Sequence, residues 1–157
     1  GLLPLSDRLA SRFTNEKVLT GYLRYKTGPG HNDFSKPEPI YVEPATERVR
    51  WQKPVAVLTN RRAYSSTNDF VSKMKEMPQA MIIGDKTGGG SGLPFSSELP
   101  NGWSVRFSAS PMYDSDMQHL EFGIEPDIQV HMTSEDIHQG IDTIIETARK
   151  QLKNLLK

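Results

Sequence analysis

The chain has 157 residues, enough for one domain, or for part of a larger one, with a proper hydrophobic core. Its 19 Lys and Arg residues balance its 19 Asp and Glu residues, so no excess charge points to nucleic acid or an anionic membrane. The absence of cysteine excludes disulfides, zinc–thiolate sites and a thiol nucleophile, and no apolar run reaches membrane-spanning length. We expect no metal, cofactor or nucleic-acid partner.

The N-terminal part of the chain predicts one helix followed by two strands. Leu5–Phe13 is predicted to be a short helix, and Lys17–Lys26 alternates well enough for a strand. Thr27–Pro39 is rich in Gly, Pro, Asn and Asp and indicates a long surface loop before an edge strand at Ile40–Val42. The predicted apolar face of the helix consists of Leu5, Leu9, Ala10 and Phe13.

The middle of the chain predicts a strand, a helix and a second strand. Val55–Leu58 is a short apolar run, typical of a fully buried strand in a sheet that is covered on both faces. Apolar residues at helical spacing then predict a helix that begins near Ser65–Thr67 and ends by Met77, before Pro78. Gln79–Ile83 supplies the second strand, so this region predicts one βαβ crossover.

Two serines, Ser65 and Ser66, lie where the predicted helix begins after the strand Val55–Leu58. A helix N-terminus presents unpaired N–H groups and partial positive charge, which suits an oxyanion. The hydroxyl of Ser65 beside the N–H of Ser66 would therefore supply half of an acyl-transfer site. The alternative is that Ser65 or Ser66 is only the helix cap, because Ser is among the favoured capping residues.

A glycine-rich turn, Gly84–Gly92, follows the second strand. Glycines allow unusual dihedral angles and close backbone approach. We expect this loop to shape the wall of the Ser65 site, with Gly88, Gly89 and Gly90 at the substrate cleft.

The C-terminal third predicts a hairpin, a loop, a short strand and a long helix. Pro94–Leu99 and Trp103–Ala109 flank a Pro-Asn-Gly turn, which is a strong hairpin signal, and Pro111–Leu120 is an acidic loop. Ile128–Val130 is the last strand, and Thr133 begins one final amphipathic helix. The apolar stripe of that helix consists of Ile137, Ile141, Ile144, Ile145, Ala148, Leu152 and Leu155.

Three segments in order carry a resemblance to a known family. They are Asn60–Asn68 (NRRAYSSTN), Gly84–Gly90 (GDKTGGG) and Phe122–Ile128 (FGIEPDI). Together they resemble the C-terminal processing (tail-specific) serine peptidases, and the likeness runs from Gly1 to about Val130. The resemblance implies an α/β fold of the crotonase-like (ClpP-like) β-α superhelix type. Residues 1–157 would then be the C-terminal part of the catalytic domain, truncated at its N-terminus.

The resemblance also implies site residues. The family's nucleophilic serine falls on Ser65, and the residue that supplies an oxyanion-hole amide falls on Ser66. If Gly1 is the second glycine of the family's upstream glycine motif, its N–H would be the other oxyanion donor.

The chain departs from the family at the general base. Members with a Ser-Lys dyad carry a lysine where this chain has Gly90, and their following glutamine aligns with Pro94. A tricorn-like branch uses Ser-His-Ser-Glu instead, and its glutamate corresponds to Glu121. The base would come from residues outside this chain, or from His119 supported by Glu121, although His119 also reads as an ordinary loop histidine.

We therefore expect a serine peptidase domain acting on polypeptide substrates in the periplasm or cell envelope, the location being inferred from the family. The alternative is a non-catalytic module of the same fold that binds peptides or other ligands. An exposed sheet edge, if a core strand is missing, would favour a homodimer formed by strand pairing. Sedimentation that shows only monomer at high concentration would contradict the dimer prediction.

Overall fold

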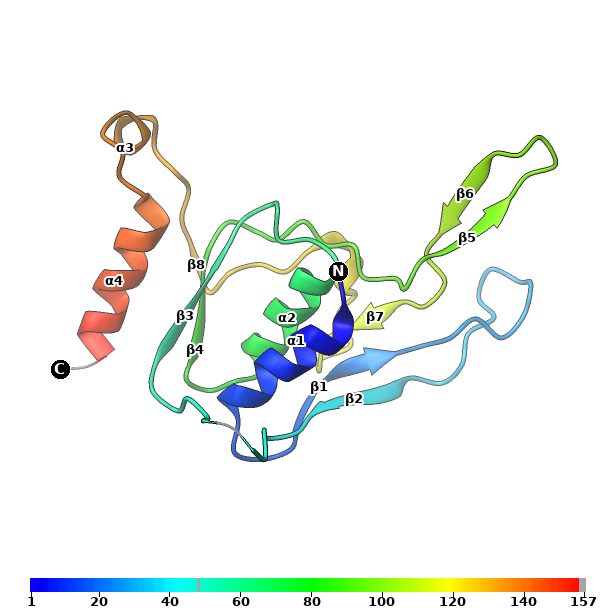
Figure 1. Ribbon diagram of the computed structural model, residues 1–157, viewed down its shortest axis with the longest axis horizontal. Coiled ribbons are helices and arrows are strands. Elements are labelled where there is room, and N and C mark those ends of the chain that lie inside the picture. The colour runs from blue at the N-terminus through cyan, green and yellow to red at the C-terminus, as the bar shows by residue number, and fades with distance from the viewer. Residues whose placement is uncertain (48, 156–157) are drawn as a thin grey trace.

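The computed structural model describes residues 1–47 and 49–155, in which two small sheets and a hairpin surround a pair of helices (Figure 1). The helices are α1 (Leu3–Ala10), α2 (Ser66–Lys75), α3 (Ser134–His138) and α4 (Thr143–Leu155), with 3₁₀ turns at Ser11–Phe13 and Leu120–Phe122. The strands are β1 (Val18–Leu23), β2 (Glu38–Val42), β3 (Val55–Thr59), β4 (Ala80–Gly84), β5 (Phe95–Glu98), β6 (Ser104–Phe107), β7 (Met112–Tyr113) and β8 (Ile128–Gln129). The mixed α/β class is as predicted.

The predicted strand–helix–strand unit is confirmed and forms the centre of the molecule. β3 and β4 pair in parallel with α2 between them in the chain, and β8 adds to the far side of β4. The prediction that Val55–Leu58 is fully buried is wrong, because β3 is an edge strand with one neighbour and Leu58 is 44% exposed. An apolar run identifies a strand, but its burial depends on partners that lie elsewhere in the chain.

The other sheet is antiparallel, in the order β2-β1-β7. The edge strand predicted at Ile40–Val42 is confirmed, since β2 has β1 as its only neighbour in this sheet of the described chain. The loop predicted at Pro111–Leu120 is partly wrong, because Met112 and Tyr113 form β7 and pair with Leu23 and Tyr22. A two-residue strand is too short to show the alternation by which strands are recognised in sequence.

The predicted hairpin is confirmed as β5–β6, which extends away from the body of the molecule (Figure 1). Phe95 pairs with Phe107 across the hairpin, and their ring centroids are 5.6 Å apart. At the base of the hairpin, Pro94 and Arg106 lie at the cavities described below. The hairpin therefore forms one wall of the candidate site.

Helix α1 packs on α2, but not through the face that its leucines predict. Leu5 and Leu9 are 56% and 47% exposed, whereas Ser6 and Ala10 are buried. Ser6 is buried because its hydroxyl bonds to Asp69 of α2, and a hydrophobic pattern cannot reveal such a polar contact. The main core lies between α2 and the two sheets and consists of Ala10, Val42, Val71, Met74, Met77, Ile82, Met112, Leu120 and Ile124.

The single C-terminal helix of the prediction is two helices in the structure. α3 ends at His138 and is followed by Gly140, which has a φ of +69°. The N–H groups of Gly140 and Ile141 bond back to the carbonyls of Ile137 and Asp136. This is the glycine-terminated pattern that closes many helices. Asp142 then caps α4, because its Oδ1 accepts the amides of Ile144 and Ile145.

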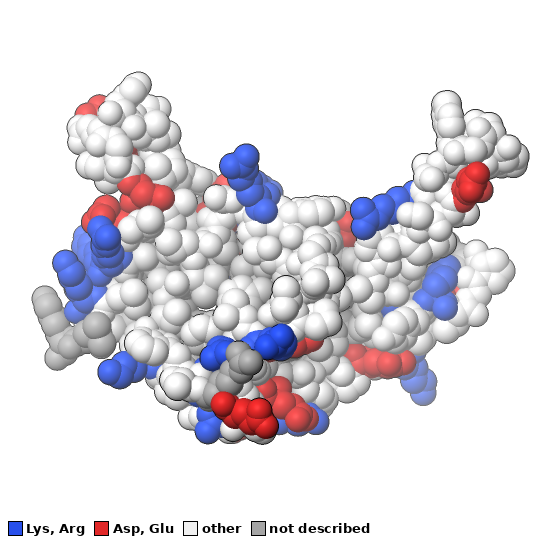
Figure 2. Space-filling model, viewed as in Figure 1, with Lys and Arg blue, Asp and Glu red and all other residues white. Residues whose placement is uncertain are grey.

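Acidic and basic side chains lie close to one another over the face shown in Figure 2, as the balanced composition leads one to expect. In the described ranges, none of the helices combines the length and the apolar character needed to cross a bilayer.

Candidate active site

Ser65 lies at the start of α2 in a strained conformation. Its φ and ψ are +60° and −123°, a region that non-glycine residues seldom occupy and that is typically found at functional sites. Its amide donates to the carbonyl of Gly89 at 2.8 Å, which fixes the turn. Ser65 occupies the N-cap position, yet its hydroxyl makes no capping hydrogen bond to the helix. The hydroxyl is therefore free for another role.

The amide of Ser66 is the first of α2, and the first amides of a helix have no acceptor inside it. Gly1 lies directly against the start of α2, and Figure 1 shows the beginning of the chain beside this helix. A Cβ built on Gly1 would be 1.8 Å from Ser66 Oγ. The structure thus brings Gly1, Ser65 and Ser66 together. These are three of the residues that the sequence predicts for the site.

Two adjoining cavities meet at Ser65. The first, of about 310 Å³, includes Gly1 and Asp69, and the second, of about 220 Å³, includes Glu121. Glu121 therefore lines the same cavity as Ser65. Arg106 lines both cavities and pairs with no acidic group among residues 1–47 and 49–155. Sequence reasoning missed it, since alternation in a hairpin does not show what the strand faces.

His119 lines neither of the cavities to which Ser65 contributes. Its ring packs edge-on against Tyr113 with centroids 5.1 Å apart, and its Nδ1 accepts the amide of Glu121 at 3.1 Å. It borders instead a cavity of about 290 Å³ together with Glu121 and Phe122. His119 thus helps to hold the Glu121 backbone while its own ring lies outside the Ser65 cavities.

The three glycines predicted for the substrate cleft, Gly88, Gly89 and Gly90, have different surroundings. Of these three, Gly90 alone lines the Ser65 cavities, as does Gly92 farther along the loop, and the φ of Gly90 is +78°. Gly88 and Gly89 instead approach backbone closely, because a Cβ on Gly88 would lie 2.4 Å from the Arg61 carbonyl oxygen, and one on Gly89 would lie 2.0 Å from the Glu121 carbonyl oxygen. These two glycines therefore position the site more than they line it.

Gly89→Ala is expected to lower the free energy of unfolding by about 3 kcal/mol or more, because strain at a φ of +77° adds to overlap with the Glu121 backbone. Gly102→Ala is the matched control, since its φ is +83° but nothing lies within 4 Å of the added carbon. There we expect a loss of about 1 kcal/mol from strain alone. Urea unfolding followed by circular dichroism measures both, and equal losses would contradict the importance of the close approach.

A buried hydrogen-bond network joins α2 to the glycine loop and to the segment that carries Glu121. The side chain of Asn68 is fully buried; its Nδ2 donates to Ser91 Oγ at 2.9 Å and to the Leu120 carbonyl at 3.1 Å. Thr87 donates its hydroxyl to Asn68 Oδ1 at 2.6 Å and accepts the amide of Ile124 at 2.7 Å. Glu121 lies between the two anchored positions, Leu120 and Ile124. The network therefore holds Glu121 beside Ser65.

A second network fixes α1, and with it Gly1, against α2. Lys73 Nζ lies 2.5 Å from Asp69 Oδ2 and 2.6 Å from Asp7 Oδ1, and Ser6 donates to Asp69 at 2.6 Å. Lys73 and Asp69 have side chains only 4% exposed. Sequence reasoning did not find this pair, although the i,i+4 spacing of Asp69 and Lys73 is the available signal.

Comparison with known proteins adds three findings. The model of "Peptidase family S41" matches residues 1–130. A protein of Sulfurisphaera tokodaii, provisionally named a tricorn-like protease C-terminal subunit, is 28% identical over 145 residues, which are 88% of this chain and 16% of that protein. The crystal structure of a provisionally assigned peptidase from Parabacteroides merdae is 61% identical with a TM-score of 0.93, over 97% of this chain and 48% of that one.

A more distant structure shares the fold. Mature CPAF complexed with lactacystin is 18% identical with a TM-score of 0.80, over 99% of this chain and 41% of that one. The chain therefore spans about half, or less, of the length of the proteins that it matches.

Proposed function

The chain belongs to peptidase family S41, and on this premise we propose that it carries the nucleophile of a serine endopeptidase that cleaves polypeptides. The observation that carries the proposal is the geometry of Ser65. Its hydroxyl makes no bond to the helix that it precedes, its backbone is strained, and it lies in two cavities at a helix N-terminus. A simple helix cap would bond to the helix, and it would require neither the strained backbone nor the two cavities.

In the proposed reaction, Ser65 Oγ attacks the scissile carbonyl carbon while a general base removes the hydroxyl proton. The carbonyl oxygen becomes an oxyanion that accepts hydrogen bonds from the N–H groups of Ser66 and Gly1, at the positive end of α2. Collapse of the intermediate breaks the peptide bond, and the leaving amine takes the proton from the base. Water then hydrolyses the acyl-enzyme by the same steps in reverse order.

Among residues 1–47 and 49–155, no histidine and no lysine lines the two Ser65 cavities. We propose that the base is supplied by the part of the protein that lies outside this chain, which spans 48% of the Parabacteroides merdae structure. Glu121, held at the second cavity, would orient that base through a hydrogen bond. His119 is the alternative base, and it would first have to leave its place against Tyr113.

We further propose that the chain is the C-terminal part of a crotonase-like catalytic domain in a periplasmic or envelope protein. The likeness of fold to mature CPAF supports the domain, and the location rests on family resemblance alone. The edge strand β3 is where the predicted strand pairing between two copies would occur.

Labelling of the full-length protein with a fluorophosphonate probe tests the proposal. We expect the probe to modify Ser65, as located by peptide mass spectrometry, and Glu121→Gln to slow the labelling by about tenfold or more through loss of the oriented base. Absence of labelling in a folded full-length protein, or modification at a different serine, would contradict the assignment.

A non-catalytic peptide-binding module is the second candidate, and it is favoured because no histidine or lysine among the described residues lines the Ser65 cavities. Such a module would bind peptides in the cleft with an affinity that Ser65→Ala leaves unchanged. It would also resist the probe, so the labelling experiment separates the two functions.

A further inference from the structure

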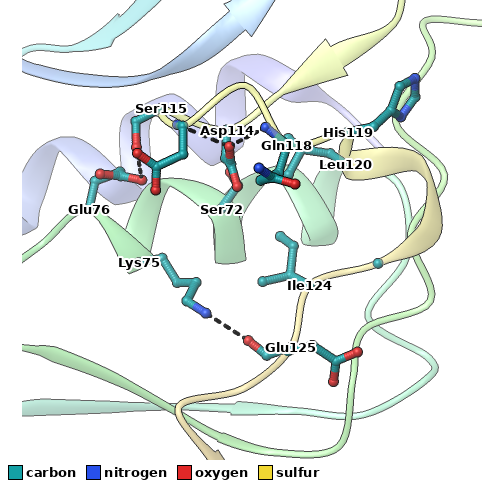
Figure 3. Close-up of a pocket in the computed structure, with 12 residues that line it drawn as sticks. Ser72, Lys75, Glu76, Asp114, Ser115, Gln118, His119, Leu120, Ile124 and Glu125 are labelled. Carbon is teal, nitrogen blue, oxygen red and sulfur yellow. Dashed lines mark hydrogen bonds between the residues drawn. The ribbon is translucent and has the colours of Figure 1, made fainter.

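A separate cavity, of about 530 Å³, lies beside the C-terminal half of α2 and is shown in Figure 3. Its walls are the end of α2, the loop from 114 to 120 and the segment from 123 to 125. It shares no lining residue with either of the cavities at Ser65. A volume of this size lies within the range of small-ligand sites, about 300–1,000 Å³.

The charged residues that line this cavity are predominantly acidic. It contains four carboxylates, Glu76, Asp114, Asp116 and Glu125, against a single lysine, Lys75. Carboxylates gathered in a concave, partly desolvated site attract cations more strongly than the same groups on an open surface.

The two lysines near the cavity, Lys75 and Lys86, bind Glu125 and Asp127. Lys75 Nζ donates to the Glu125 carbonyl at 2.8 Å (Figure 3) and lies 3.5 Å from Asp127, and Lys86 pairs with the Glu125 carboxylate at 2.8 Å. In the described part of the chain, no lysine or arginine pairs with the three remaining carboxylates at the cavity. Those three are Glu76, Asp114 and Asp116.

Two of the three carboxylates, those of Glu76 and Asp114, are held in place without being neutralised. Glu76 Oε1 accepts the hydroxyl of Ser115 at 2.7 Å, and Asp114 Oδ1 accepts the amides of Asp116 and Gln118 at 3.0 and 2.7 Å. These bonds orient the groups and leave their negative charge in place. The loop is therefore preorganised around an acidic centre.

Ser72 gives an independent indication of a ligand. It lies in the wall of the cavity and is only 3% exposed, yet its Oγ has no hydrogen-bond partner among the described residues. Buried hydroxyl groups are nearly always paired, so each exception calls for an explanation. A polar ligand at this wall of the cavity would supply the missing partner.

The dipole of α2 also favours a cation in this cavity. α2 ends at Lys75, with Glu76 as its C-cap, so its negative end lies at this cavity while its positive end lies at Ser65. The opposite ends of one helix thus favour ligands of opposite charge.

We propose that this cavity binds an organic cation, a guanidinium or a primary ammonium group, held by Glu76, Asp114 and Asp116 with Ser72 at its wall. A metal ion fits less well, because across residues 1–47 and 49–155 no three histidine or acidic side chains converge closely enough to ligate one. The site does not depend on Ser65 and goes beyond the peptidase function. His119 and Leu120 also line it, so a bound cation contacts the segment that continues into Glu121.

Calorimetric and NMR titration of the protein at low salt tests the proposal, with N-acetyl-arginine methylamide as the probe. We expect saturable binding that perturbs the amides of Gln118 and Gly123, and binding of the uncharged citrulline analogue that is weaker by about tenfold or more. Asp116→Asn and Ser72→Ala should each weaken binding of the arginine probe, and we expect Asp116→Asn to lower its affinity by about tenfold. Glu98→Gln, which removes one charge from the exposed hairpin, should leave binding unchanged.

Equal binding of the arginine and citrulline probes would overturn the proposal, as would an Asp116→Asn protein that melts normally and binds like the wild type. Two further probes identify the source of the cation. Tighter binding of acetyl-Gly-Arg-Gly-amide than of spermidine indicates a polypeptide side chain, whereas the reverse order indicates a free polyamine. Either order of the two affinities supports an organic-cation site in this cavity.

Discussion

Replacement of Ser65 by alanine is expected to abolish peptide-bond cleavage by the full-length protein, lowering kcat by about 10⁴-fold or more. The loss follows from the covalent step, because no other hydroxyl occupies the strained position at the start of α2 that places Ser65 Oγ in both cavities. The measurement is turnover of a fluorogenic peptide, with circular dichroism to confirm that the variant is folded.

Ser66→Ala is the informative comparison, since the two serines are adjacent. The proposal uses the backbone N–H of Ser66, which alanine keeps, so we expect kcat to fall by less than about tenfold. If Ser66→Ala removed activity while Ser65→Ala retained it, the assignment of the nucleophile would be wrong by one residue.

Lys73→Met is expected to lower the free energy of unfolding by about 3–5 kcal/mol. Methionine keeps most of the length and packing of the lysine stem, but it leaves the Asp69 carboxylate, which is 4% exposed, without its cation. Chemical denaturation of the purified variant measures the loss. Because Lys73 also binds Asp7 of α1, we expect α1 to loosen against α2 and Gly1 to leave its place beside Ser66.

Two variants show whether the buried charge is the cause. Lys75→Met removes a lysine whose side chain is 36% exposed, and we expect a change within about 1 kcal/mol. The double variant Lys73→Met/Asp69→Asn removes both charges and should recover at least half of the stability lost in the single variant. A double variant no more stable than Lys73→Met would show that lost packing, not an unpaired charge, causes the loss.

Local pattern was sufficient for the central unit of the fold. The apolar runs of β3 and β4, with helical spacing between them, predicted the crossover and the helix start at the serines. The Pro-Asn-Gly turn predicted the β5–β6 hairpin. These features depend on residues within about one turn or strand of one another, so they are visible in a single sequence.

Local pattern failed where a partner from a distant segment decides the outcome. The edge position of β3, the pairing of β7 with β1 and the burial of Ser6 in place of Leu5 all depend on contacts between remote parts of the chain. The break after α3 is a different case. Gly140 was visible in the sequence, but whether a glycine weakens a helix or ends it depends on how much packing holds the two sides together.

For the site, the sequence by itself determined that Ser65 and Ser66 lie at a helix start, because a strand, a turn and a helix follow from neighbouring residues. Only the tertiary structure decided that Glu121 shares a cavity with Ser65 and that His119 does not. Glu121 reaches that position through Asn68, which is 53 residues before it in the chain and bonds to the neighbouring Leu120 carbonyl. Periodicity shows which side of an element is apolar, but it carries no information on which polar groups meet when the elements pack.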